Sequence, residues 1–197
     1  MKLSLADKLR CSRVKRWHLL DADQNLAEHQ FNVAHIAISV VNLAAKFGCE
    51  TGNIHTTQKN VAFLALHHDV PESLMGDLPT HIKKIDNVRN ITNEIESNFD
   101  PYVGGMPDYS EFEKWAVKVA DFVDAYIYTQ NRIEGSRYAT NAATDIFAAA
   151  EKHISKLFDE SLARSFLLTI LAMASGKNEH SILEGIVTSD QKGIIDG

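Results

Sequence analysis

The clearest structural signal in the chain is the stretch Leu64-Ala65-Leu66-His67-His68-Asp69-Val70-Pro71-Glu72. Its first half is an apolar run that is typical of a helix packed against a core. Two polar side chains, His68 and Asp69, then stand side by side before Pro71 interrupts the helix. Neighbouring residues on a helix point about 100° apart, so two such side chains reach one ion only near a helix end. We therefore expect a helix that ends at His68 and Asp69.

A histidine and an aspartate attached to a core segment are costly to bury unless something pairs with them, and a metal ion is a usual partner. The dipeptide alone is common, and it also fits a helix end at which both side chains cap backbone groups. The metal interpretation therefore depends on whether other helices bring polar side chains to the same place.

Length and composition are those of a folded globular protein. The chain has 197 residues, of which 45% are apolar and 23% charged, enough for one substantial domain or at most two small ones. The formal charge of −6 argues against a general nucleic-acid binder but leaves room for a local basic pocket that takes a small anion. Two cysteines, Cys11 and Cys49, are too few for a disulfide framework and fit a reducing cytosol.

No segment is typical of export or of a membrane span. The N-terminus mixes charged residues into its apolar ones, so it lacks a signal-peptide core. The longest clearly apolar run, residues 166–174, is interrupted by Thr169 and is too short to cross a bilayer. We expect a cytoplasmic protein, or one of the host cytoplasm if it is encoded by a phage, with neither a membrane nor a nucleic-acid polymer as partner.

Apolar residues recur with helical spacing along most of the chain, and no alternating run demands a sheet. Asn25 is placed to cap one helix, which Gly48 would end. Other helices are expected over residues 3–14, from a loop at 52–57 to Asp69, from Pro79, and over 87–99, 115–131, 138–158 and 160–174. The predicted fold is all-α: a single compact helical bundle over residues 1–197.

Two further polar side chains lie on apolar helix faces. His29 is in the first turn of its helix, and apolar residues follow it four, seven and eleven positions later on the same stripe. Asp121 is in the middle of another helix, among inward-facing apolar residues. Each has an ordinary alternative: His29 as a core histidine bonded to a backbone carbonyl, and Asp121 as the partner of Lys118 or of an arginine.

Together these positions offer two imidazoles and two carboxylates, from His29, His68, Asp69 and Asp121. A mixed nitrogen and oxygen set of this kind suits one divalent transition metal, whether Co, Mn, Zn, Ni or Fe. Four protein ligands on a six-coordinate ion leave positions open for water and a phosphate oxygen. The pattern therefore predicts a metal that activates water for attack on a phosphate.

This H…HD…D pattern resembles that of the HD-domain metal-dependent phosphohydrolases. The match is closer to the bacterial 5'-deoxynucleotidases and the bacteriophage dATP triphosphohydrolases, and it covers about residues 13–133. It is carried by Arg16-Trp17, Glu28-His29, His68 to Glu72, Gly76-Asp77-Leu78-Pro79-Thr80 and Ala120-Asp121. The resemblance implies an HD-type bundle with its metal and substrate core at about 13–133, which the helices of residues 138–174 complete.

The resemblance also implies roles for residues around the metal. Glu72, three residues after Asp69, would act as general acid and base beside the attacking water, so we expect Glu72 and Asp69 to be catalytic. The alternative for Glu72 is a favourable charge at a helix N-terminus. Asp124, one turn from Asp121, would support the site without binding the metal. His67 is expected to point away from it.

The substrate implied by the family is a 2'-deoxynucleoside 5'-phosphate. Arg16 would bind its 5'-phosphate and Trp17 would flank its sugar or base. Asp77 would sense the 3'-hydroxyl and crowd out a 2'-hydroxyl, while a helix cap is its alternative. Lys83 would face the phosphates, although it also fits a solvated surface position.

The leading hypothesis is hydrolysis of deoxynucleoside 5'-phosphates to deoxynucleoside and phosphate. A dATP-type triphosphohydrolase is the alternative, and it requires extra cations, which Arg13, Lys15, Lys83 and Lys84 offer. A non-catalytic metal- or nucleotide-binding module and a helical interaction protein without a site also remain open. The family commonly forms dimers, so a homodimer is possible, and the run 166–174 fits an interface as well as a core. Residues 176–197 have no predicted role.

Overall fold

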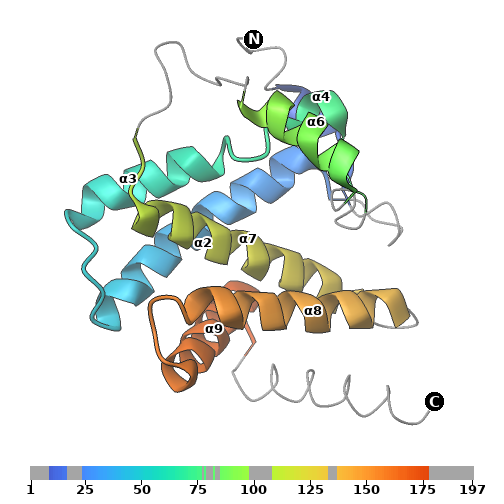
Figure 1. The fold of residues 1–197 in the computed structure, drawn as a ribbon. Helices are drawn as coiled ribbons and strands as arrows, with labels where there is room; N and C mark the ends of the chain where they lie inside the picture. Colours follow the sequence, from blue (N-terminus) through green and yellow to red (C-terminus); the bar gives the residue numbers. More distant parts are fainter. Residues whose placement is uncertain are drawn as a thin grey trace.

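A computed structural model describes residues 9–16, 24–76, 78, 82, 85–97, 108–132 and 137–177. Within these ranges the chain is built of helices, and an isolated bridge pairs Lys15 with Asn25. In chain order (Figure 1) they are η1 (Arg10–Arg13), α2 (Leu26–Lys46), α3 (Ile54–Ala65), α4 (Glu72–Met75), α6 (Asp86–Ser97), α7 (Glu111–Gln130), α8 (Arg137–Ile154) and α9 (Glu160–Ser175). The predicted all-α class is confirmed.

The start of α2 follows from its capping residue. The Asn25 side chain accepts a hydrogen bond of 3.0 Å from the backbone N–H of Glu28, which satisfies one of the unpaired donors of the first turn. At the other end the chain turns away through Gly48, whose φ of 87° is a left-handed conformation that glycine adopts without strain. Both predicted ends of this helix are confirmed.

The helix before the His-Asp pair was predicted with the wrong ends. Its N-cap is Asn53, whose side chain accepts from the N–H of Thr56, so α3 begins inside the segment that was assigned to a loop. It ends at Ala65, and the chain then passes through consecutive turns to Pro71. Backbone hydrogen bonds in these turns join residues three apart, such as Val70 to His67. His68 and Asp69 therefore lie in tight turns just beyond the helix.

Smaller corrections apply to the other helices. The predicted N-terminal helix is a 3₁₀ turn at Arg10–Arg13 within the described residues. α7 begins at Glu111, four residues before the predicted start, because Ser110 and Glu113 form a reciprocal capping box. α6 spans Asp86–Ser97 and α8 ends at Ile154. The helix predicted to start at Pro79 lies largely outside the described residues.

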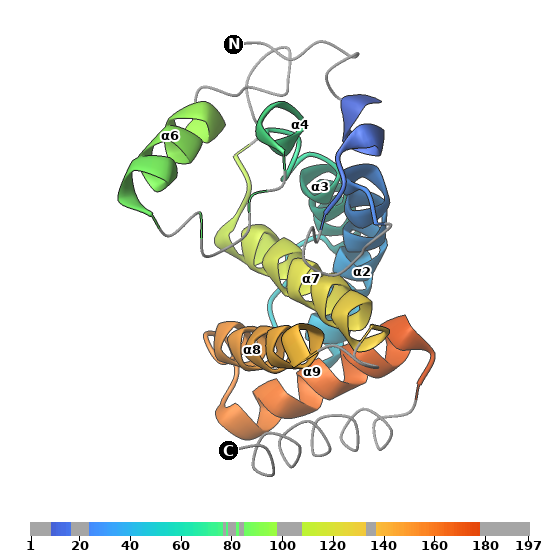
Figure 2. The same ribbon diagram turned by 90° about the vertical axis from the view of Figure 1, so that its right-hand side faces the viewer.

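The core is formed where α2, α3, α7, α8 and α9 meet. α2 packs against both α3 and α7, and α7 also packs against α8. α9 packs against α2, α7 and α8 (Figure 2). At its centre Phe166 is fully buried, with ring centroids of Phe47, Phe158 and Trp115 within 5.2–5.9 Å. The apolar residues between 166 and 171 therefore belong to the core rather than to an exposed interface.

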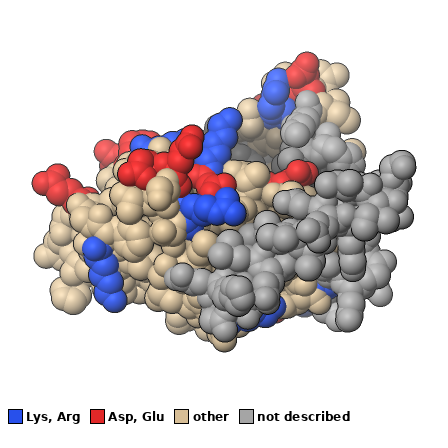
Figure 3. All heavy atoms as spheres, turned by 90° about the horizontal axis from the view of Figure 1, so that it is seen from below, with Lys and Arg blue, Asp and Glu red and all other residues tan. Residues whose placement is uncertain are grey.

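None of the described helices is long and apolar enough to cross a membrane. On the face shown in Figure 3, basic and acidic side chains are interspersed among uncharged ones.

We predict that Phe166→Ala lowers the free energy of unfolding by about 3–5 kcal/mol, because it removes the ring at the centre of the aromatic cluster and leaves a cavity. Urea unfolding followed by circular dichroism measures the change. Leu162→Ala is the matched control, since Leu162 lies on the same helix with 44% of its surface exposed. Similar losses in the two variants would contradict this account of the core.

Candidate metal and active site

Three parts of the fold bring the predicted metal ligands together. His29 comes from the first turn of α2, His68 and Asp69 from the turns after α3, and Asp121 from the middle of α7. His29 Nε2 lies 3.3 Å from Asp121 Oδ1 and 3.4 Å from Asp69 Oδ2. His68 Nε2 lies 3.2 Å from the same Asp69 oxygen. Ligand atoms of His29, His68 and Asp121 are all within 4.8 Å of one another.

Both imidazole rings are oriented by a hydrogen bond on the side away from this group. The Nδ1 of His29 lies 2.6 Å from Asp124 Oδ2, and the Nδ1 of His68 lies 2.6 Å from the carbonyl oxygen of Ala65. In each ring this leaves Nε2 directed at the carboxylates. The alternative of a core histidine bonded to a backbone carbonyl therefore does not describe His29, whose partner is a carboxylate from α7.

The donor set fits a divalent cation. The Nε2 atoms of His29 and His68 are buried, and no residue that the structure describes forms a hydrogen bond with them. A buried nitrogen without such a partner costs free energy, and an ion bound between these nitrogens and the facing carboxylate oxygens removes that cost. Imidazole nitrogens suit Zn, Fe and Ni and carboxylate oxygens suit Mn, so this mixed set fits a divalent transition metal.

The electrostatics of the group agree with this fit. Burial alone would lower the pKa of His29, but three nearby carboxylates outweigh burial and raise it to about 10. These carboxylates belong to Asp121, Asp124 and Asp69. Burial would raise the pKa of Asp121, yet the nearby charges of Lys118 and His29 hold it below its usual range. Asp121 therefore stays ionised and offers anionic oxygen to a cation.

Asp121 contacts two neighbouring side chains, one through each carboxylate oxygen. Its Oδ2 accepts a hydrogen bond of 2.6 Å from Lys118 Nζ, while Oδ1 faces His29. The pairing with Lys118, which the sequence offered as the alternative to metal binding, is thus present together with the geometry for metal binding. One oxygen remains directed at the centre of the group.

Arg16 lies next to this group. Its backbone N–H donates to the carbonyl oxygen of Gln24 over 3.0 Å, and the N–H of Leu26 donates to that of Val14 over 2.8 Å. These bonds fasten the segment before α2 to the segment that carries Arg16. The guanidinium charge is close enough to oppose the rise in the pKa of His29, and two of its nitrogens, Nε and Nη1, are buried. Arg16 therefore adds positive charge beside the histidines.

Glu72 is the first residue of α4 and is only 5% exposed. Its backbone N–H donates to the carbonyl oxygen of Asp69 over 2.9 Å, so the two carboxylates belong to one turn. Burial raises the pKa of the Cys11 thiol, and the negative charges of Asp69 and Glu72 add to that rise. Both carboxylates therefore lie near Cys11, on the side of the site formed by η1.

The remaining predicted residues divide into two groups. Trp17, Asp77, Lys83 and Lys84 lie outside the described residues. His67 contacts Phe63 instead, with its Nδ1 2.7 Å from the carbonyl oxygen and the two ring centroids 4.7 Å apart. Sequence reasoning missed Gln24 and Asn32, which both bind Asp124, because no spacing rule connects residues about a hundred positions apart.

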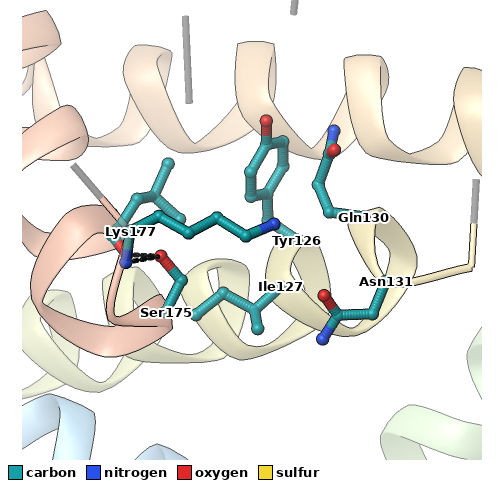
Figure 4. Close-up of a pocket in the computed structure, with 7 residues that line it drawn as sticks. Tyr126, Ile127, Gln130, Asn131, Ser175 and Lys177 are labelled. Carbon is teal, nitrogen blue, oxygen red and sulfur yellow. Dashed lines mark hydrogen bonds between the residues drawn. The ribbon is translucent and has the colours of Figure 1, made fainter. Parts of the chain in front are cut away.

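A separate pocket lies between the C-terminal ends of α7 and α9 (Figure 4). The Lys177 backbone N–H donates to Ser175 Oγ over 3.3 Å at its edge. Its lining residues are Tyr126, Ile127, Gln130, Asn131, Leu171, Ser175 and Lys177. None of the predicted site residues is among them, so this pocket is distinct from the metal group.

Comparison with known families decides the classification. The sequence profile of the family described as 5'-deoxynucleotidase YfbR-like matches residues 5–173. A 5'-deoxynucleotidase of Pasteurella multocida is 31% identical over 156 residues, 70% of this chain and 76% of that protein. The chain belongs to the YfbR-like 5'-deoxynucleotidase family. The resemblance to HD-domain phosphohydrolases that the sequence indicated is therefore confirmed.

Other relatives of this YfbR-like protein carry two different names. The 5'-deoxynucleotidase YfbR of Escherichia coli is 29% identical over 185 residues, which is 82% of this chain and 90% of that one. A dATP triphosphohydrolase of Salmonella phage PMBT28 is 30% identical over 146 residues, 72% of this chain and 73% of that one. The names of these relatives thus include both of the activities predicted from the sequence.

Solved structures show the same fold. The HD phosphohydrolase DatZ of cyanophage S-2L, solved with dA and one catalytic Zn²⁺ ion, superposes with a TM-score of 0.66 at 17% identity. The match covers 90% of this chain and 100% of DatZ. A conserved hypothetical protein of Pyrococcus furiosus matches with a TM-score of 0.51 at 18% identity, over 79% of this chain and 95% of that one.

We predict that metal binding by this YfbR-like protein strengthens with pH, by about tenfold per unit between pH 6 and 8. In that range His29, with its pKa near 10, carries a proton that a metal ion must displace. Calorimetric titration with Zn²⁺ or Mn²⁺ measures the affinity at each pH. His35→Ala, which removes an exposed histidine of α2, should leave the slope unchanged. A metal affinity that does not change between pH 6 and 8 would show that His29 carries no proton that the ion must displace.

Proposed function

We propose that this protein is a metal-dependent 5'-deoxynucleotidase, which hydrolyses 2'-deoxynucleoside 5'-monophosphates to deoxynucleoside and phosphate. The observation that carries the proposal is the convergence of two buried imidazole nitrogens and two carboxylates from three separate segments, with no described hydrogen-bond partner for either nitrogen. Arg16 and Glu72 lie beside this group, and family membership supports the same activity.

In this proposal His29, His68, Asp69 and Asp121 hold one divalent transition metal ion, whether Co, Mn, Zn, Ni or Fe. When bound, such an ion acts as a Lewis acid and lowers the pKa of water. The protein supplies imidazoles that are already oriented by Asp124 and the Ala65 carbonyl. Little side-chain order then has to be gained when the ion binds.

The residues of the chain manage the proton and the phosphate. Glu72 accepts the proton of the attacking water, whose oxygen bonds to phosphorus, and it returns a proton to the 5'-oxygen as the P–O5' bond breaks. Arg16 binds the phosphate oxygens through its fork of N–H donors, which offsets the negative charge that water must approach. Asp69 contributes by holding the metal one turn before Glu72.

We assign substrate selection to residues identified by resemblance. Asp77 would accept a hydrogen bond from the 3'-hydroxyl and exclude a 2'-hydroxyl, while Trp17 would stack beside the sugar or base. Lys83 would add charge near the phosphate. The partner is then a deoxynucleotide, and we propose a cytoplasmic location for the reaction.

A dATP-type triphosphohydrolase is the second proposed activity, favoured by the phage relative at 30% identity. Cleavage occurs at the same P–O5' bond, so the metal ligands and Glu72 would have the same tasks. Accommodation of a triphosphate requires additional cations. Arg13 and Lys15 are exposed on the segment that leads to Arg16, where such a chain of phosphates would extend.

A homodimer also remains a proposal. Because the apolar residues between 166 and 171 are buried in the core of one chain, an interface would use other surfaces. Sedimentation analysis of the intact protein settles the oligomeric state.

The first test is product chromatography with a panel of dNMPs, NMPs and dNTPs, in added Co²⁺ or Mn²⁺ and with a chelated control. We expect deoxynucleoside and phosphate from dNMPs, and at least about tenfold less turnover of NMPs, since crowding of one hydroxyl is worth 1–3 kcal/mol or more. Deoxynucleoside and intact triphosphate from dNTPs would establish the second activity. No turnover of any nucleotide would refute both.

The second test is Glu72→Gln, which keeps the size of the side chain but removes its proton-accepting carboxylate. We expect kcat to fall about 10²–10⁴-fold, the usual contribution of a general acid or base, while metal content stays the same. Glu113→Gln is a matched control, because Glu113 is another buried carboxylate, at 6% exposure, held by Asn60 and Ser110 away from the site. Retained activity in Glu72→Gln would remove Glu72 from the mechanism.

A further inference from the structure

Asp124 is a buried carboxylate at which three hydrogen bonds converge. His29 Nδ1 lies 2.6 Å from Oδ2, Gln24 Nε2 donates to the same oxygen over 2.9 Å, and Asn32 Nδ2 donates to Oδ1 over 2.9 Å. Its side chain is 7% exposed, and that of His29 is 0% exposed. Isolated burial of a carboxylate is expensive, so this arrangement persists because all three donors are present.

The donors come from separate places in the chain. His29 and Asn32 are one turn apart on α2, whereas Gln24 precedes that helix and Asp124 is on α7. Gln24 is itself held, since its backbone N–H donates to the Tyr128 hydroxyl over 3.1 Å, one turn further along α7. Gln24 and Asn32 therefore hold the Asp124 carboxylate in place independently of its contact with His29.

Asp124 acts on His29 from the side opposite to the metal group. The imidazole nitrogens are on different edges of the ring, and Asp124 contacts Nδ1 while Asp69 and Asp121 face Nε2. Asp124 is consequently not a metal ligand. A carboxylate on Nδ1 requires that nitrogen to carry the hydrogen, which leaves the lone pair of Nε2 directed at the metal position.

We propose that Asp124, held in place by Gln24 and Asn32, is the positioning residue that sets the tautomer and the ring orientation of His29 for metal binding. The inference rests on the proposed metal-dependent function, and it extends that function to Gln24 and Asn32, which have no part in it so far. A simple structural anchor between α2 and α7 would not change the metal affinity of His29, so the two roles differ in what they predict.

The test is Asp124→Asn, which preserves shape but lets an amide N–H compete for Nδ1 and favour the wrong tautomer. We expect Zn²⁺ affinity, measured by competition with a fluorescent chelator, to fall about 10- to 100-fold. In nitrogen-15 spectra of the Zn²⁺-loaded protein, the Nδ1–H signal of His29 should shift or vanish. Glu113→Gln makes the same chemical change in a buried carboxylate of the same helix, and it should leave both readouts unchanged.

Two milder variants keep the inference testable if Asp124→Asn does not fold. Gln24→Leu and Asn32→Ala each remove one donor and leave the carboxylate, so each should weaken Zn²⁺ binding by a smaller factor than Asp124→Asn. Combined in one chain, they should weaken it by more than either alone. If all these variants bind Zn²⁺ within twofold of the parent and keep the Nδ1–H signal, Asp124 is only a structural anchor.

Failure of this inference can be separated from failure of the proposed function. A parent protein that binds Zn²⁺ and loses affinity in Asp124→Asn, but hydrolyses no nucleotide, supports the positioning role and refutes the nucleotidase. A parent protein that hydrolyses dNMPs, with Asp124→Asn equal to it in Zn²⁺ affinity, supports the enzyme and overturns the positioning role.

Discussion

The packing of α2 against α7 depends on one buried histidine that has carboxylates on both edges. His29 contacts Asp124 through Nδ1 and faces Asp121 through Nε2, and both aspartates are on α7, one turn apart. A ring held in this way fixes the rotation of each helix about its own axis as well as the distance between them. The apolar core around it sets the stability, but this contact determines which residues of the two helices meet.

The turns after α3 complete the site because they are not helical. In a regular helix His68 and Asp69 would point in different directions. The three-residue hydrogen bonds between Leu64 and Leu74 tighten the chain, so that both side chains reach the position opposite His29. The same tightening brings Glu72 into one turn with Asp69. The carboxylates proposed as general base and metal ligand are thus positioned by a single local feature.

The charges of the site are balanced by neighbours that have separate tasks. Lys118 occupies one oxygen of Asp121 and leaves the other directed inward. Arg16 contributes positive charge beside His29, on a segment fastened to the start of α2 by backbone hydrogen bonds. Gln24 connects these features, because its carbonyl binds the Arg16 backbone and its side chain binds Asp124. A substitution of Gln24 would therefore disturb both the segment that carries Arg16 and the hydrogen bonds of Asp124.

The sequence by itself determined the all-α class, both ends of α2, the inward position of His29 and the family. These follow from local rules: Asn25 caps its own helix, Gly48 ends it, and apolar spacing fixes which face is buried. The ends of α3 and α7 were misjudged, although Asn53, Ser110 and Glu113 carry the capping chemistry that places them. The tertiary structure alone decided that Gln24 and Asn32 hold Asp124, and that Asp121 faces His29. Such contacts join residues about a hundred positions apart, and no local periodicity records which side chains meet when two helices pack.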